Sequence, residues 1–432
     1  MIANFRNLLF FYLFIFCPIL SFGQADLVTA INSELIPLKS VEATSDFSDL
    51  EGLKSILKDK RIVGLGEATH GTHEFFTFKH RMLEFLVKEM GFKTFTIEAD
   101  FAGTFAMNDY VVNRNGTVLE ALEEMATGVW FTKEFMDMVE WIKQYNLTQT
   151  NENKVKFYGF DMQFAFNSAP ALLNGTIKLK EPLSDNARKG LQVIIDHRYG
   201  AMDKSQLPLL NATAKELEKA VVVKSSPEKT KIYQQYISAV IQTIEFSIPK
   251  HRFDKDIIRD KYMAENCEWI YNFTGESKMI VWAHNLHIAK DITKNNNLPM
   301  GYYLSQKYPN EYYAIGFGFN SGSFRAYHTE KKKIMICTVP EVSIKNSSDY
   351  VFGQCAVPNF ILDFKSAQVN PTINEFLNKN IYSRAIGAQY NPKKDENGGK
   401  VSNQKLIKMY DAIIFIDNTT AVSPIRPVRN AQ

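Results

Sequence analysis

The chain has 432 residues, of which 45% are hydrophobic and 22% are charged, proportions typical of a globular protein that exclude wholesale disorder. Its 50 basic and 47 acidic residues leave a formal net charge of +3 with the signs interspersed, so the sequence carries no basic footprint for nucleic acid. This length assures a sizeable core, and we expect a small molecule as the partner.

The first 23 residues are typical of a secretory signal peptide. Arg6 precedes an apolar run at 8–20, and Ser21-Phe22-Gly23 supplies the small residues of a cleavage site. The run is too short for a comfortable transmembrane helix, and no other apolar stretch of about 20 residues follows it. We therefore predict export to the bacterial periplasm or outside the cell, without stable membrane insertion, and a mature domain at 24–432.

The next segment predicts a strand, a helix and a second strand. Residues 61–65 are a short apolar run that ends in glycines, residues 75–90 carry apolar side chains at helical spacing, and residues 93–97 are again apolar. A short connection of this kind makes the two strands parallel with a right-handed crossover. Glu67 and Glu98, which follow the two runs, are then expected near each other at one edge of the sheet.

The rest of the chain continues the alternation around a helical insertion. Residues 155–161 form another apolar run that ends on an acid, and residues 169–272 contain amphipathic helical patterns that predict a lobe. Strand-like runs return at 278–284, 312–319, 333–339, 360–364 and 411–417. The pattern predicts an α/β fold with a largely parallel central sheet flanked by helices, plus this helical lobe.

Two pairs of histidines follow predicted strands. His70 and His73 come after the first strand, and His284 and His287 come after the run that begins at 278. Open α/β sheets bind ligands at the carboxyl ends of their strands, and histidine can take and return protons near neutral pH. Structural histidines and a helix-capping Glu67 are the plain alternative, but two such pairs at two strand ends favour a functional site.

Further polar residues have plain alternatives of their own. Asp161 is a strand-end acid that could equally cap the following helix, and Arg259-Asp260 lie on a predicted helix, where a solvated ion pair would contribute little. The sequence lacks a Gly-x-Ser-x-Gly elbow, a P-loop and a dinucleotide-binding glycine motif. The remaining histidines and carboxylates suit either direct activation of water or a catalytic zinc with three protein ligands.

Ordered blocks along the chain resemble the erythromycin esterase family. The first block is Gly66-Glu67-Ala68-Thr69-His70-Gly71, and the others follow at 74–76, 96–100, 158–163, 259–260, 263–266, 282–285, 360–363 and 410–414. This resemblance implies hydrolysis of a macrolide lactone ester by an activated water, with no covalent enzyme intermediate and no required metal.

The resemblance also implies roles for individual residues. His70 would be the general base, Glu67 and Glu98 would orient it and the water, and His284 and Arg259 would stabilise charge on the carbonyl oxygen. These five form the predicted catalytic set.

A second set is predicted to contact the substrate, an apolar ring that needs a broad cleft with aromatic walls. Its members are His287, Lys79, Asp161, Phe101 and Trp130. Lys79 stands where the family usually has an arginine, and it keeps the charge but loses the bidentate fork.

Two other functions stay open on the same residues. The histidine pairs would suit a metal-dependent hydrolase of another ester or amide, with a divalent cation as cofactor. Glu-x-x-His at a strand end also resembles haem- or metal-binding relatives of the fold, which would make the chain an exported binding protein.

Overall fold

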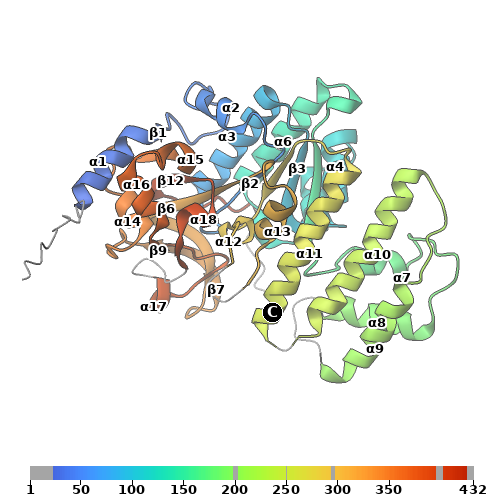
Figure 1. Cartoon of the computed structure of the whole chain (residues 1–432). Coiled ribbons are helices and arrows are strands. Elements are labelled where there is room, and N and C mark those ends of the chain that lie inside the picture. Colours follow the sequence, from blue (N-terminus) through green and yellow to red (C-terminus); the bar gives the residue numbers. More distant parts are fainter. Residues whose placement is uncertain (1–22, 198–202, 250, 293–296, 396–401, 426–432) are drawn as a thin grey trace, which may run out of the picture.

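The computed structural model describes residues 23–197, 203–249, 251–292, 297–395 and 402–425. These residues form a twisted sheet with helices on both faces and a helical lobe at one side (Figure 1). The expected α/β architecture is confirmed. The predicted signal segment 1–23 lies, apart from Gly23, outside the described residues.

Ten strands of the described residues form one sheet in the order β1-β8-β12-β6-β2-β5-β3-β4, with β7 and β10 paired to β6. The neighbours from β12 to β4 are all parallel, whereas β8 is antiparallel to β12 and β1 is antiparallel to β8. The strands are β1 Ile36–Pro37, β2 Ile62–Leu65, β3 Thr94–Asp100, β4 Lys156–Asp161, β5 Met279–Trp282, β6 Tyr312–His328, β7 Lys333–Val339, β8 Asn359–Asp363, β10 Gln389–Tyr390 and β12 Ala412–Thr419, and a separate pair joins β9 Asn380–Ser383 to β11 Ser402–Lys405.

Side chains of the central strands alternate between two cores, as the two-residue period of a strand requires. On β5, Ile280 and Trp282 enter the core of one face, while Met279 and Val281 enter the core of the other. Helices that pack on the first face are α2 Glu51–Leu57, α3 His73–Met90, α4 Thr104–Asn113, α5 Val118–Met125 and α6 Lys133–Leu147. Helices on the second face are α1 Gln24–Glu34, α11 Arg252–Phe273, α12 Asn285–Ile288, α13 Met300–Lys307, α14 Ser348–Phe352, α15 Phe364–Ala367, α16 Pro371–Asn378 and α18 Leu406–Met409. The chain also forms α17 Pro392–Asp395 and 3₁₀ turns at Gly128–Trp130, Asn151–Asn153 and Lys204–Gln206.

The lobe has a third core of its own. It consists of α7 Ser168–Leu173, α8 Asp185–Asp196, α9 Leu207–Leu217 and α10 Pro227–Ser247, and its buried residues include Leu191, Leu210 and Val240. α11 lies between the lobe and the sheet (Figure 1), and its buried residues belong to the second core of the sheet. The helical segment expected at 169–272 thus divides into a lobe and one helix of the main body.

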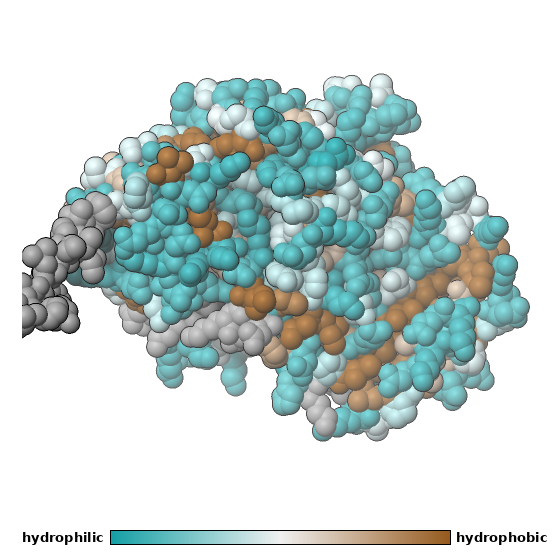
Figure 2. All heavy atoms as spheres, in the orientation of Figure 1, coloured by the Kyte–Doolittle hydropathy of each residue, from teal (hydrophilic) through white to brown (hydrophobic). Residues whose placement is uncertain are grey.

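The surface of the lobe differs from that of the main body. Figure 2 shows hydrophobic side chains gathered in a band across the lobe, while those of the main body form smaller, separate patches among hydrophilic side chains. Among the described helices, none combines the length and the apolar character needed to cross a bilayer.

Candidate active site

The carboxyl ends of four neighbouring strands carry the predicted polar residues. Glu67 follows β2, His284 follows β5, Glu98 lies near the end of β3, and Asp161 ends β4. β5 inserts between β2 and β3, although it comes later in the chain than both. His284 is therefore placed between Glu67 and Glu98, the two acids that the sequence predicts near each other at one edge of the sheet.

An irregularity in β3 sets the direction of the Glu98 side chain. The register between β3 and β4 shifts between Ile97 and Asp100, so Glu98 lies in a bulge. Bulges next to active sites redirect a side chain that would otherwise alternate with its neighbours.

The loop that carries His70 is held by two close backbone approaches. A Cβ atom at Gly71 would lie 2.0 Å from the carbonyl oxygen of Arg325, so only glycine fits there. The amides of Ile386 and Gly387 donate to the carbonyl of Ala68 at 2.7 and 3.1 Å. Gly387 has a φ of +69°, a left-handed conformation that favours glycine.

Glu67 is the hub of the first part of the site. Its side chain is fully buried, and it accepts hydrogen bonds from His70 Nδ1 at 2.5 Å, Lys79 Nζ at 2.6 Å and Trp282 Nε1 at 2.8 Å. The Lys79 ammonium also lies 4.2 Å from the centre of the Trp282 ring, a cation–π contact. Glu67 thereby fixes the tautomer and the orientation of His70.

The ionisation of this cluster follows from its burial. Burial acts to raise the pKa of Glu67, but the charge of Lys79 and the hydrogen bond from His70 outweigh it, and the pKa lies below its ordinary value. Burial lowers the pKa of Lys79 to about 8, against the attraction of Glu67. The Lys79 side chain is also fully buried against Glu67, so it cannot contact a substrate. This corrects its predicted contact with substrate.

His284 presents a hydrogen-bond donor to the site. Its Nδ1 accepts the amide of Leu286 at 3.2 Å, and a neutral imidazole that accepts at one nitrogen carries its proton on the other. Burial, and then the nearby His70, lower the pKa of His284 to about 3, so the ring is neutral. Its Nε2 is buried without a partner among the described residues, and its ring centre lies 5.3 Å from that of His70.

Arg259 forms hydrogen bonds with both acids on the β3–β4 side of the site, Glu98 and Asp161. It reaches from α11 to Asp161 through Nε at 3.2 Å and Nη2 at 2.7 Å, to Glu98 through Nη2 at 2.6 Å, and to His287 Nε2 through Nη1 at 3.1 Å. Glu98 also accepts the backbone amide of His284 at 3.0 Å. Burial acts to raise the pKa of Glu98, but the charges of His287 and Arg259 hold it far below its ordinary value.

These contacts change the roles expected from the sequence. Glu98 bonds Arg259 and His284, and no hydrogen bond to His70 is found within the described part of the chain. Arg259 directs its N–H groups at Asp161, Glu98 and His287, so it holds the cluster together rather than standing free for a carbonyl oxygen.

Two site residues were missed by the sequence patterns. For Asp260 the sequence offers only the alternative of a solvated ion pair, but the residue is 2% exposed and accepts His287 Nδ1 at 2.7 Å and the Met300 amide at 2.9 Å. Trp282 was read only as part of a block, but its indole N–H holds Glu67. Their partners are far away in the chain, and the only hint was the position of each beside a predicted site residue.

Phe101 and Trp130 are not brought to the site. Phe101 is fully buried and packs against Phe105 and Trp269, and Trp130 is 1% exposed and packs against Trp282 and Phe135. Both side chains lie in cores and cannot line an open cleft, which corrects their predicted contact with substrate.

His73 and Glu74 hold the C-terminal segment instead of entering the site. His73 Nδ1 bonds Glu134 at 2.7 Å, and that carboxylate also accepts the amide of Ser423. Glu74 accepts the amide and the hydroxyl of Thr420 at 2.8 and 2.7 Å.

The arrangement does not suit a metal ion. Within the described residues, no group of three or more histidine, cysteine or acidic side chains has the geometry to hold one. His284 could not contribute Nε2, because the proton on that nitrogen leaves it no lone pair for a metal.

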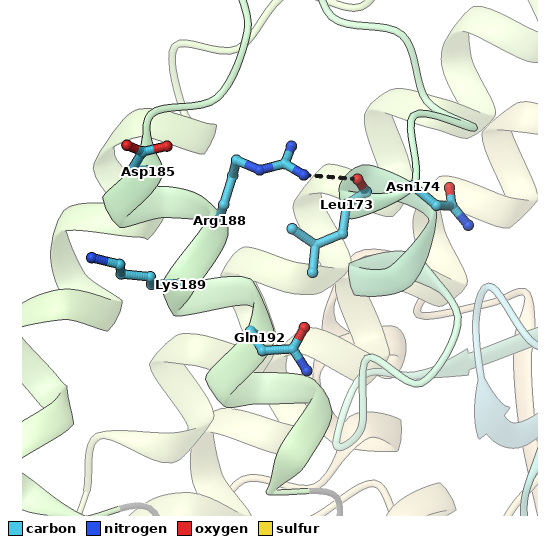
Figure 3. A pocket seen from close by; sticks show the side chains of 6 residues that line it. All are labelled: Leu173, Asn174, Asp185, Arg188, Lys189 and Gln192. Atoms are coloured by element: carbon cyan, nitrogen blue, oxygen red, sulfur yellow. Dashed lines mark hydrogen bonds between the residues drawn. The ribbon is translucent and has the colours of Figure 1, made fainter.

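A hollow of about 510 Å³ opens elsewhere, on the lobe (Figure 3). It is lined by Leu173, Asn174, Asp185, Arg188, Lys189 and Gln192, with Arg188 reaching the carbonyl of Leu173 at 3.4 Å. It is a wide surface depression with mixed charges and no histidine. At the strand ends, by contrast, the ring of His70 lies beside that of His284, whose Nε2 has no partner among the described residues.

Known proteins are similar to this chain in sequence and in fold. The profile of the erythromycin esterase family matches residues 87–419, a range that includes Glu98, Arg259 and His284 and begins after His70. The chain is 24% identical to a putative hydrolase of Bacillus subtilis, YbfO, over 89% of each chain, and 25% identical to an erythromycin esterase type II of Escherichia coli over 69% of this chain and 78% of that one. A crystal structure of a succinoglycan biosynthesis protein covers 93% of this chain and 98% of its own, with 25% identity and a TM-score of 0.77.

Proposed function

This chain belongs to the erythromycin esterase family, and we propose that it hydrolyses the lactone ester of macrolides such as erythromycin with a water that His70 activates. Membership makes it a hydrolase that acts on esters. The observation that carries the proposal is the pairing of Glu67 with His70 opposite the unpartnered N–H of His284.

His70 has the tautomer of a general base. Because its Nδ1–H donates to Glu67, its Nε2 keeps the lone pair and can take a proton from water. The Glu67 carboxylate then stabilises the imidazolium that forms, as the acid of a catalytic triad does. The buried Lys79 and Trp282 keep Glu67 ionised and in place.

The N–H of His284 is suited to stabilise the oxyanion that forms when water attacks the ester carbonyl. A neutral N–H donor that is already fixed and desolvated stabilises charge developing on a carbonyl oxygen without reorganisation. Its backbone amide is held by Glu98 and its Nδ1 by Leu286, so the ring cannot turn away. We assign this role to His284 alone, because Arg259 is committed to the acids around it.

The macrolide substrate is supported by the erythromycin esterase among the relatives and by the hydrophobic band on the lobe beside α11, which suits an apolar ring. The proposal includes export directed by residues 1–23 and resistance to macrolides in the cell that makes the protein.

Mass spectrometry of erythromycin incubated with the purified protein tests the function. We expect a product heavier by one water, formed equally well after treatment with a chelator, and no product from His70→Gln. His328→Gln, on the outer part of β6, is the matched control and should keep full activity. Unchanged mass across several macrolides would exclude the substrate, and near-wild-type turnover by His70→Gln would exclude the base.

A further inference from the structure

A second carboxylate–histidine pair faces the site from the side opposite Glu67 and His70. Asp260 Oδ1 accepts His287 Nδ1 at 2.7 Å, which repeats the 2.5 Å contact between Glu67 and His70 Nδ1. In both pairs the acid is almost fully buried and the imidazole is about one-sixth exposed. Nδ1 of each ring faces its acid, which leaves Nε2 as the nitrogen that can exchange a proton, and in His287 this nitrogen lies beside Arg259 and Glu98.

His284 lies between the two pairs. Its ring centre is 5.3 Å from that of His70 and 6.4 Å from that of His287. An ester carbonyl held by His284 Nε2–H would therefore have one histidine on each flank. One flank receives the attacking water, and the other is left for the alkoxy oxygen.

The surroundings of His287 accommodate both of its protonation states. Nε2 lies 3.1 Å from Arg259 Nη1, a donor that suits the neutral ring, and 3.6 Å from Glu98 Oε1, an acceptor that suits the protonated ring. The ring can give up or regain the proton at Nε2 without leaving its place, because Asp260 holds Nδ1 in both states. Burial acts to lower the pKa of His287, but Asp260 and Glu98 outweigh it and raise the pKa above its ordinary value.

We propose that the Asp260–His287 pair is the general acid of the reaction, with His287 donating the proton to the leaving oxygen and Asp260 as its positioning residue. This role rests on the proposed ester hydrolysis and adds the step that it left open. An unactivated ester, such as a macrolactone, expels an alkoxide, and protonation of that oxygen is then part of the barrier.

The Glu67–His70 pair gains one proton in the reaction and the Asp260–His287 pair loses one. His70 Nε2 removes a proton from water as the water oxygen bonds the carbonyl carbon. The bond from that carbon to the alkoxy oxygen then breaks, its electron pair stays on that oxygen, and His287 Nε2 supplies the proton. His70 ends with one extra proton and His287 with one fewer, solvent resets both, and the net reaction is ester plus water to acid plus alcohol.

The leaving group of the ester provides the test. A p-nitrophenyl ester expels a stable phenolate that needs no acid, whereas a simple alkyl ester or a macrolactone does. We expect His287→Gln to lower kcat/KM for the alkyl ester and the macrolactone by about 10²- to 10⁴-fold, the usual contribution of an acid–base group. The p-nitrophenyl ester should be hydrolysed almost as fast as by the wild type, which also shows that the variant is folded.

The pH profile separates positioning from simple structural support. His287 must be protonated to act, so activity on the alkyl ester falls as the pH rises through its pKa. Asp260→Asn keeps an oxygen for the Met300 amide but removes the charge that raises this pKa, so the alkaline limb should move to lower pH, and Asp260→Glu should move it back. Groups around the ring that bear on this limb are Asp256, Arg259 and Asp260 on α11, Glu98 on β3, Asp161 on β4 and His284.

The outcomes are distinct for the two proposals. His251→Gln, at the exposed start of α11, is the control and should leave both substrates unaffected. An equal loss on both esters, or no loss on either, in His287→Gln would overturn the general-acid role while ester hydrolysis stands. A wild-type protein that hydrolyses no ester would overturn the proposed function and this role with it.

Discussion

At the scale of single residues, the buried charged side chains of the site are each paired with a partner of opposite charge or with a hydrogen-bond donor. Glu67 and Lys79 are both fully buried, and each would be costly alone. The indole N–H of Trp282 completes the partners of the carboxylate. Such a cluster holds His70 in one tautomer, because an ionised carboxylate can only accept a hydrogen bond from Nδ1.

The buried pair predicts a large effect on stability when its cation is removed. Lys79→Met leaves Glu67 buried and uncompensated, so we expect the free energy of unfolding to fall by about 3–5 kcal/mol, measured by urea denaturation. Lys133→Met, on the exposed side of α6, removes a solvated pair with Asp137 and should cost at most about 1 kcal/mol.

A double variant checks that the loss comes from the stranded charge. Lys79→Met combined with Glu67→Gln removes both charges, and it should be more stable than Lys79→Met alone. If the double variant is the less stable of the two, lost packing around Lys79 explains the effect better than electrostatics.

At the scale of elements, α3 and the end of β3 depart from simple patterns. α3 buries Lys79, His80, Arg81 and Glu84 in addition to its apolar face. The sequence predicted the helix from its apolar spacing, but it could not predict this polar burial, because the partners of Lys79 and Arg81, Glu67 and Asp49, lie outside the helix. The bulge that aims Glu98 likewise depends on how β3 meets β4.

His80 of α3 predicts a pH dependence of stability. Burial lowers its pKa to about 3, and its Nε2 lies 3.4 Å from Glu84 Oε1 without forming a hydrogen bond. Between pH 6.5 and about 3 the unfolded chain binds a proton at this residue that the folded chain does not. The contribution of neutral His80 to the free energy of unfolding is therefore fully present above pH 6.5. It is lost as the pH falls, by about 1.4 kcal/mol per pH unit.

Unfolding free energies at pH 7 and pH 5 measure this contribution. From pH 7 to pH 5 the wild type should lose about 2 kcal/mol more than His80→Gln, which cannot take up the proton. His328→Gln, half-buried on β6, should follow the wild type. Parallel losses in His80→Gln and the wild type would show that the proton is accepted in the folded state.

At the scale of the whole molecule, the chain has a sheet with two cores and a lobe with a third. The lobe core is separate from those of the sheet, and α11 joins the two bodies while carrying Arg259 and Asp260 into the site. Stability is then expected to be uneven, with the lobe as a unit that opens by itself.

Leu210→Ala tests this separation. The side chain is fully buried in the lobe core, so its truncation should cost about 2–5 kcal/mol of local stability. Hydrogen exchange should accelerate in α7–α10 and remain slow in β2, β5 and β3. Val221→Ala, half-exposed on the lobe, should change neither, and equal acceleration throughout the chain would mean that lobe and sheet unfold together.

The sequence by itself determined the α/β class, the strand runs and the family, and it predicted a site of Glu67, His70, Glu98, Arg259 and His284. Apolar periodicity, strand-end acids and ordered blocks are local signals, and they survive without knowledge of the fold. They also misassigned Phe101 and Trp130, because an aromatic side chain next to a motif looks the same in a core as in a cleft.

Only the tertiary structure decided which residues meet. The insertion of β5 between β2 and β3 set His284 between the acids, and the approach of α11 turned Asp260 from an expected surface residue into the partner of His287. The physical reason is that the ionisation and the role of a charged side chain depend on what surrounds it. Here those surroundings come from elements far apart in the chain, such as Glu67 and Trp282, which are separated by 215 residues.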